Sequence, residues 1–226
     1  MVSLRMSEAD HALVSAAVAK AERESDGEVV TIVAPRSDAY HDVGLHYAVL
    51  AMLLVPPLLA VLPQRWIDWG LGLFLGWEET LARGMLMTLL FVLLAVAFLI
   101  VRFALAWMPL RMALTPSATK TRRVRRRALE LFKVGTDSRT KGRTGVLLYL
   151  SLLEHRAEIV ADEAIHSKVD PEVWGEAMAV LTEHVRRGEL GQGMALAVEK
   201  IGAVLAEHLP PQAENPNELP DRLIEL

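Results

Sequence analysis

Four side chains that could bind a metal ion lie close together in the last third of the chain: Asp162, Glu163, His166 and Asp170. Carboxylate oxygens suit Ca²⁺ or Mg²⁺, whereas the imidazole would favour a transition metal. A metal held there could polarise a phosphoryl oxygen or activate a water molecule. The alternative interpretation is structural, because Asp170 stands before Pro171 as a helix cap and the other three suit a solvated loop.

A second candidate site lies in the Gly-containing segment just before residue 145. Arg139, Lys141 and Arg143 could bind a phosphate through their side chains and through backbone N–H groups. The alternative is that these charges are solvated and face lipid headgroups. The chain contains no P-loop pattern, no HExxH and no recognisable Ser/His/Asp arrangement, so the sequence indicates neither nucleotide binding nor those hydrolytic mechanisms.

Composition narrows the classes of function further. The 226 residues include no Cys, so disulfides, a thiolate nucleophile and Cys-ligated zinc are excluded. The net charge of −4 argues against a general nucleic-acid-binding protein, since such proteins carry a basic surplus. We therefore expect no nucleic-acid partner.

Two long apolar runs lie in the middle of the chain, and each is long enough to cross a hydrocarbon core about 30 Å thick. Pro56-Pro57 interrupts the first run, which predicts a kinked span or, alternatively, a re-entrant segment. The second run has no polar residue from Met85 to Ile100 except Thr88, whereas a core helix of a soluble protein would keep a polar stripe. The sequence predicts a transmembrane hairpin over residues 43–110, with spans at about 43–64 and 84–108.

The charges that flank the spans predict their orientation. The connecting segment Arg65–Arg83 has little positive charge and carries three Trp residues suited to the membrane interface. A strongly basic segment follows the second span, so the positive-inside rule places Arg111–Arg127 in the cytoplasm and Arg65–Arg83 outside; with two spans, residues 1–42 are cytoplasmic too. We interpret the basic residues as topology determinants that contact anionic lipid, with a solvated helix face and a nucleic-acid patch as alternatives. They are Arg122, Arg123, Arg125, Arg126 and Arg127.

The remaining segments predict a small α/β domain. One strand precedes the hairpin and two follow it, which is too few for two independent sheets. We therefore expect a single domain built from residues 1–42 and 111–209, followed by an irregular polar tail at 210–226. The predicted helices begin at Ser7 and Asp170 and cover 118–133 and 191–208, and the predicted strands are 28–34, 146–152 and 156–161.

This order of elements resembles the TPM-domain family, in the branch of bacterial membrane proteins with two inserted spans. The resemblance is carried by Gly27–Val33, Ala128–Phe132, Gly145–Ser151 and the hairpin Arg156–Glu163. It implies a three-layer α/β/α-type domain interrupted by a transmembrane helical hairpin, with an acidic cleft near one sheet end. Some members of the family are credited with acid phosphatase activity or calcium binding, and others with assembly or repair of membrane complexes.

Two departures from the family pattern bear on function. Typical members carry Asp-Asn-Gly before the central strand, where this chain has Arg143-Thr144-Gly145, and a glycine-rich turn where it has Asp162–His166. Our first hypothesis is therefore an integral membrane protein whose cytoplasmic TPM-like domain binds a membrane-protein partner in assembly or maintenance of membrane complexes. The alternative is a metal-dependent phosphatase that uses Ca²⁺ or Mg²⁺ at the acidic cleft.

Overall fold

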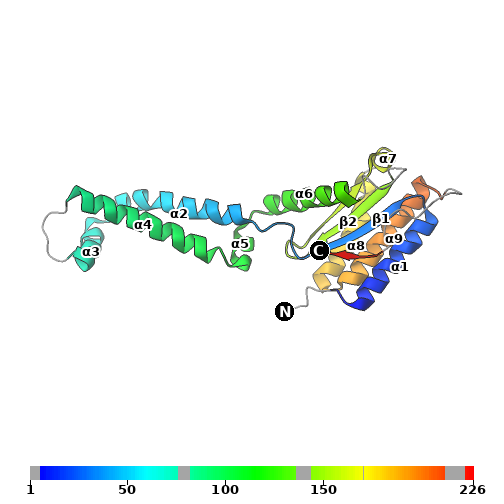
Figure 1. The fold of residues 1–226 in the computed structure, drawn as a ribbon, viewed down its shortest axis with the longest axis horizontal. Helices are drawn as coiled ribbons and strands as arrows, with labels where there is room; N and C mark the ends of the chain where they lie inside the picture. Colours follow the sequence, from blue (N-terminus) through cyan, green and yellow to red (C-terminus); the bar gives the residue numbers. More distant parts are fainter. Residues whose placement is uncertain (1–5, 76–81, 136–143, 170, 212–221) are drawn as a thin grey trace. The chain divides into compact units, whose positions relative to one another are not determined.

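The computed structural model describes residues 6–75, 82–135, 144–169, 171–211 and 222–226. The chain forms two compact units. One unit combines Met1–Asp38 with Pro116–Leu226, and the other is Ala39–Thr115. The first unit contains all the strands of the described residues, and the second contains the apolar helices (Figure 1).

A four-stranded sheet in the order β3-β2-β1-β4 forms the centre of the first unit. The strands β1 (Glu28–Ala34) and β2 (Gly145–Ser151) pair in parallel from Glu28↔Gly145 to Ala34↔Ser151. Next to them, β3 (Arg156–Ala161) runs antiparallel to β2, and β4 (Ile224–Glu225) runs parallel to β1. The two central strands therefore come from opposite sides of the apolar segment in the sequence.

Helices cover both faces of this sheet and make a three-layer α/β/α domain. On one face lies α6 (Ser117–Gly135); on the other lie α1 (Glu8–Glu24), α8 (Trp174–Arg187) and α9 (Leu190–His208). Because side chains alternate along a strand, Val29 and Val33 face α1, α8 and α9, whereas Val30 and Ile32 face α6. Burial on both faces explains why β1 and β2 are almost continuously apolar.

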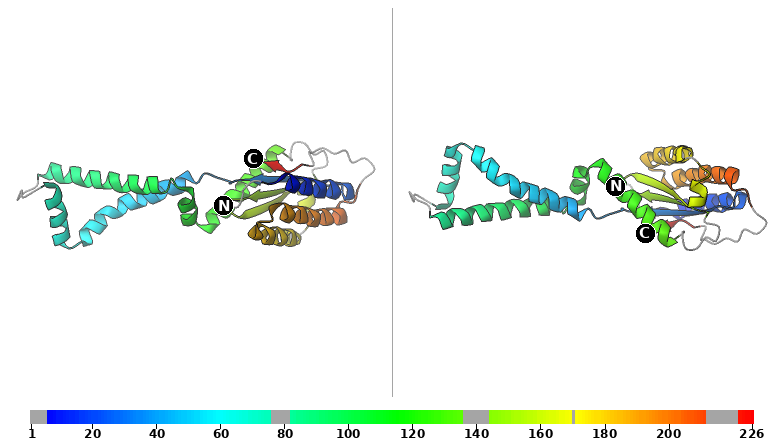
Figure 2. Two further views of the ribbon diagram at one scale, coloured as in Figure 1. Left: turned by 90° about the horizontal axis from the view of Figure 1, so that it is seen from below. Right: turned by 90° about the horizontal axis from the view of Figure 1, so that it is seen from above.

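The described residues of the second unit form the helices α2 (His41–Val61), α3 (Gln64–Leu75), α4 (Arg83–Ala104) and α5 (Met108–Leu114). Among the described residues, α2 and α4 are long and apolar enough to cross a membrane, since each contains an 18-residue stretch with a mean hydropathy of 1.9 or 2.9, respectively. By length and composition alone, these helices indicate membrane association. They lie side by side near α5 and diverge towards α3 (Figure 2).

Three segments differ from the sequence prediction. The connecting loop expected at Arg65–Arg83 contains α3, in which Gln64 Nε2 donates to Asp68 Oδ1 at 2.9 Å, one turn apart. The tail expected to be irregular ends in β4, because Leu226 N donates to Val33 O at 3.1 Å and extends the sheet edge. The residues after β3 form a short helix, α7 (Glu163–His166), and the chain enters α8 through a 3-10 turn at Pro171–Val173.

The helices α1 and α9 approach each other closely at Gly202. A Cβ built on Gly202 would stand 2.6 Å from the Cβ of Ala21. We expect Gly202→Val to lower the free energy of unfolding by about 1–3 kcal/mol, because overpacking forces the two helices apart. The measurement is thermal or denaturant unfolding of the full chain in detergent.

The matched control introduces the same side chain one residue later. Ala203 is exposed, so Ala203→Val should cost only the helix propensity of a β-branched residue, roughly 0.5 kcal/mol. Equal losses in the two variants would contradict close packing of α1 on α9 at Gly202.

Candidate functional site

Two of the predicted metal ligands, Asp162 and Glu163, lie where β3 ends and α7 begins. Asp162 is 5% exposed, and its Oδ2 accepts a hydrogen bond from Gly145 N at 3.0 Å, while its own N–H donates to Gly145 O at 3.0 Å. Glu163 is exposed, whereas the side chain of His166 and all of Asp170 lie outside the described residues. One carboxylate oxygen of Asp162 thus fastens the end of β3 to the start of β2.

The described residues contain no group of three or more His, Asp or Glu side chains that could hold a metal ion. Because two of the four predicted ligands fall outside that description, the metal site with Ca²⁺ or Mg²⁺ stays a prediction. The predicted phosphate-binding residues Arg139, Lys141 and Arg143 also lie outside the described residues.

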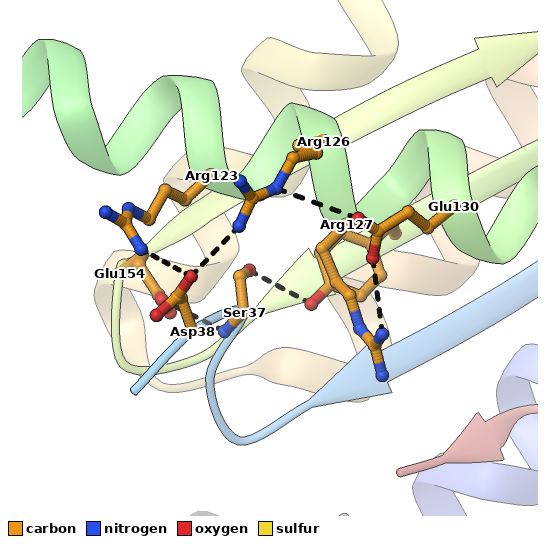
Figure 3. Close-up of polar contacts among 8 residues, drawn as sticks. Ser37, Asp38, Arg123, Arg126, Arg127, Glu130 and Glu154 are labelled. Carbon is orange, nitrogen blue, oxygen red and sulfur yellow. Dashed lines mark hydrogen bonds and ion pairs between the residues drawn. The ribbon is translucent and has the colours of Figure 1, made fainter. Parts of the chain in front are cut away.

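Four arginines of α6 form ion pairs with carboxylates of the same domain. Arg123 and Arg126 both reach Asp38 Oδ2, at 2.6 and 3.2 Å (Figure 3). Arg125 lies 3.7 Å from Glu158, and Arg127 lies 3.5 Å from Glu130. The contact with anionic lipid that the sequence predicts stays a prediction, and these ion pairs reduce the charge free for it.

A polar cluster that the sequence did not predict lies at the carboxyl ends of β1 and β2. We call it the strand-end cluster, formed by Ser37, Asp38, Tyr149, Ser151 and Glu154. Glu154 is 6% exposed; it accepts from Ser37 N at 3.0 Å and from the hydroxyl of Ser151. The hydroxyls of Ser37 and Tyr149 hydrogen-bond each other at 3.0 Å. These polar groups satisfy one another, which is the condition for burying them.

This cluster fastens the chain at the point where it leaves the domain. Asp38 is the last residue of the first unit before the apolar helices. Two further hydrogen bonds hold the same segment, since Leu152 N and Leu153 N donate to Ala34 O and Pro35 O, both at 3.0 Å. The sequence signal was slight: polar residues directly follow each strand, but only the parallel pairing of β1 with β2 brings them together.

Burial sets the electrostatics of this region. Desolvation raises the pKa of Tyr149 above its ordinary value, so the phenol stays neutral and hydrogen-bonded at physiological pH. Desolvation likewise raises the pKa of Glu158, and the charge of Arg125 partly opposes that shift. The strand-end cluster thus consists of neutral hydroxyls and a carboxylate that hydrogen-bond one another, and its role is to hold the strand ends together.

The sheet and the helices on its two faces define a three-layer α/β/α domain, and the chain of this domain is interrupted by an apolar helical insertion. A family model described as "TPM domain" matches residues 108–204. Among solved structures, the NMR structure of the BA42 protein from the psychrophilic bacterium Bizionia argentinensis is similar, with a TM-score of 0.56 and 14% sequence identity, over 100% of this chain and 98% of that chain. A comparison with curated proteins finds no match.

The chain therefore contains a TPM domain, and the resemblance noted in its sequence is confirmed. The mixed α/β fold is confirmed as well, whereas a likeness at 14% identity carries no information about activity.

The role of Asp162 can be separated from metal binding. We expect Asp162→Ala to lower the free energy of unfolding by about 1–3 kcal/mol, with or without added Ca²⁺ or Mg²⁺, because the Gly145 N–H loses its buried acceptor. Glu163→Gln is the matched variant, since Glu163 is exposed and its loss should leave stability unchanged. Unfolding curves test both, and an unchanged Asp162→Ala curve would contradict the role of Asp162 in fastening β3 to β2.

The buried phenol predicts a specific alkaline sensitivity. Above about pH 10 the unfolded chain ionises at Tyr149 while the folded chain keeps its proton, so stability falls as pH rises, by up to about 1.4 kcal/mol per pH unit. Tyr149→Phe should remove that part of the slope between pH 10 and 11. Tyr47→Phe, at a tyrosine in the second unit, is the control and should retain it; equal slopes in wild type and Tyr149→Phe would disprove the assignment.

Proposed function

We propose that this protein is an integral membrane protein of the bacterial inner membrane, with its TPM domain on the cytoplasmic side, where the domain binds a membrane-protein partner in assembly or maintenance of membrane complexes. The observation that carries the proposal is the surface of α4. An 18-residue stretch of this 22-residue helix has a mean hydropathy of 2.9, yet none of its residues is buried.

Many large apolar side chains of α4 are exposed. Phe91 is 69% exposed, Ile100 62% and Phe103 71%, and α2 adds Leu53 and Leu58 at 62% each. Soluble monomers rarely expose contiguous apolar patches of more than a few hundred Å². A lipid environment removes this cost, because the helices satisfy their own backbone hydrogen bonds and the side chains meet hydrocarbon.

The topology of the domain supports an even number of spans. Since β1 and β2 pair along their whole length, the segments before and after the hairpin belong to one folded domain and share one side of the membrane. The arginines of α6 favour the cytoplasmic side by the positive-inside rule.

We favour binding over catalysis for the domain, because the described polar groups that could do chemistry are bonded to one another. The buried polar groups of the strand-end cluster hydrogen-bond one another, and Asp162 is bonded to Gly145. The assignment to assembly or maintenance of membrane complexes comes from the family resemblance. A metal-dependent phosphatase would require His166 and Asp170 to converge with Asp162 and Glu163. In that case the wild type should bind Ca²⁺ or Mg²⁺ in a titration, and Glu163→Gln should bind it more weakly.

The absence of Cys makes the topology directly measurable. Single variants Glu8→Cys and Glu199→Cys mark the two parts of the domain, and Gln64→Cys marks α3; all three positions are exposed. In intact cells, or spheroplasts if the organism has an outer membrane, an impermeant maleimide should label Gln64→Cys at least about tenfold more than the other two, which should label only after permeabilisation.

The same variants test the partner. A cysteine-linked photo-crosslinker at Glu199→Cys should give a discrete adduct with a membrane protein, absent from Gln64→Cys. Equal labelling at all three positions, or release of the chain by alkaline carbonate, would refute the membrane topology. If the protein is inserted in the membrane but forms no crosslinked adduct, the proposal that the domain binds a membrane-protein partner is refuted.

A further inference from the structure

The wide end of the helical unit contains an apolar groove. It has a volume of about 680 Å³ and is lined by α2, α3 and α4, including Leu59, Trp66, Ile67, Gly70, Leu89 and Leu93. The lining is almost wholly hydrocarbon. Its volume falls within the range of roughly 300–1,000 Å³ typical of sites for small ligands.

The arrangement of the helices explains why the groove is open. Near α5 the helices α2 and α4 lie together, but they diverge towards the other end, where α3 bridges them (Figure 2). Two glycines on α3 leave space beside it, because a Cβ at Gly70 or Gly72 would meet nothing within 4 Å. Gly70 lines the groove and Gly72 does not.

One cation lies at the edge of the groove. The guanidinium carbon of Arg65 stands 5.7 Å from the ring centre of Trp66, which itself lines the groove. The neighbouring carboxylate of Asp68 is held by Gln64 at 2.9 Å. Within the part of the chain that the structure describes, Arg65 makes no ion pair with a carboxylate. The groove is therefore lined by hydrocarbon and has the positive charge of Arg65 beside one of its lining residues.

We propose that this groove binds one phospholipid, with an acyl chain between α2, α3 and α4 and the phosphate against Arg65. The inference rests on the proposed membrane insertion and adds a resident ligand to it. A phospholipid matches both features of the site: hydrocarbon suits the lining, and the phosphate supplies the anion that Arg65 lacks. Trp66 joins the two, since an indole ring suits the boundary between hydrocarbon and headgroup.

A second copy of the chain is a poorer match for the groove. The apolar helices α2 and α4 of another copy would bring hydrocarbon side chains to the lining, but the only carboxylate on these two helices, Asp42, lies in the first turn of α2, away from the groove-lining residues. The large exposed side chains of the hairpin, such as Phe91 and Phe103, do not line the groove, so packing of two copies through them would leave it open.

The test fills the groove through Gly70. The full chain is reconstituted in nanodiscs of palmitoyl-oleoyl phosphatidylglycerol, transferred to mild detergent, and weighed by native mass spectrometry. Wild type should retain one phospholipid per chain, and Gly70→Phe should retain at least about tenfold less, because the ring occupies the site. Gly72→Phe, which makes the same change on the same helix outside the groove, should retain the lipid.

Arg65→Gln separates the headgroup contact from the acyl-chain contact, and it should lower retention several-fold while leaving the groove intact. The proposal is overturned if wild type carries no phospholipid, if both glycine variants lose it equally, if the retained mass is a free fatty acid, or if the mass is that of a dimer that Gly70→Phe abolishes. Alkaline carbonate extraction distinguishes the two failures: a chain released by carbonate refutes membrane insertion, whereas an inserted chain without lipid refutes only the groove.

Discussion

The parallel hydrogen bonding between β1 and β2 is the constraint on which the rest of the chain depends. It joins Glu28–Ala34, before the apolar helices, to Gly145–Ser151, after them. A parallel pair cannot be closed by a tight turn and requires a long crossover, and here that crossover contains an entire helical unit together with α6. The pairing obliges both ends of the helical unit to return to one domain, and an insertion with two spans meets that requirement.

Polar groups at the strand ends hold the chain against the sheet at the end of the first unit. Glu154 bonds Ser37 and Ser151, and Asp38 bonds two arginines of α6, so the chain is fixed just where it leaves the sheet. Removing one partner from such a buried set costs about 1–3 kcal/mol, more than a typical surface contact contributes. The basic segment of α6 thus has a structural task within the domain besides any effect on topology.

A single buried arginine plays a comparable role in the helical unit. Arg111 is 3% exposed, and its guanidinium donates to Leu105 O and Ala39 O, each at 2.7 Å. Leu105 caps α4, where the last carbonyls of the helix lack partners and carry partial negative charge. The arginine therefore satisfies the end of α4 and ties it to Ala39, two residues before α2, which stabilises the end of the hairpin near α5.

The sequence alone determined the elements whose signals are local: the Ser7 cap of α1, the apolar strands β1 and β2, the periodic faces of α6, α8 and α9, and two runs long enough to span a membrane. It also supported the TPM resemblance. Only the tertiary structure decided which polar residues meet. Ser37, Tyr149 and Glu154 look unrelated along the chain, the helix α3 lay within a predicted loop, and Ile224–Glu225 lay in a predicted irregular tail. Local patterns follow from helix and strand periodicity, whereas hydrogen bonds across a sheet or between helices depend on distant segments being brought together, and no local spacing records that.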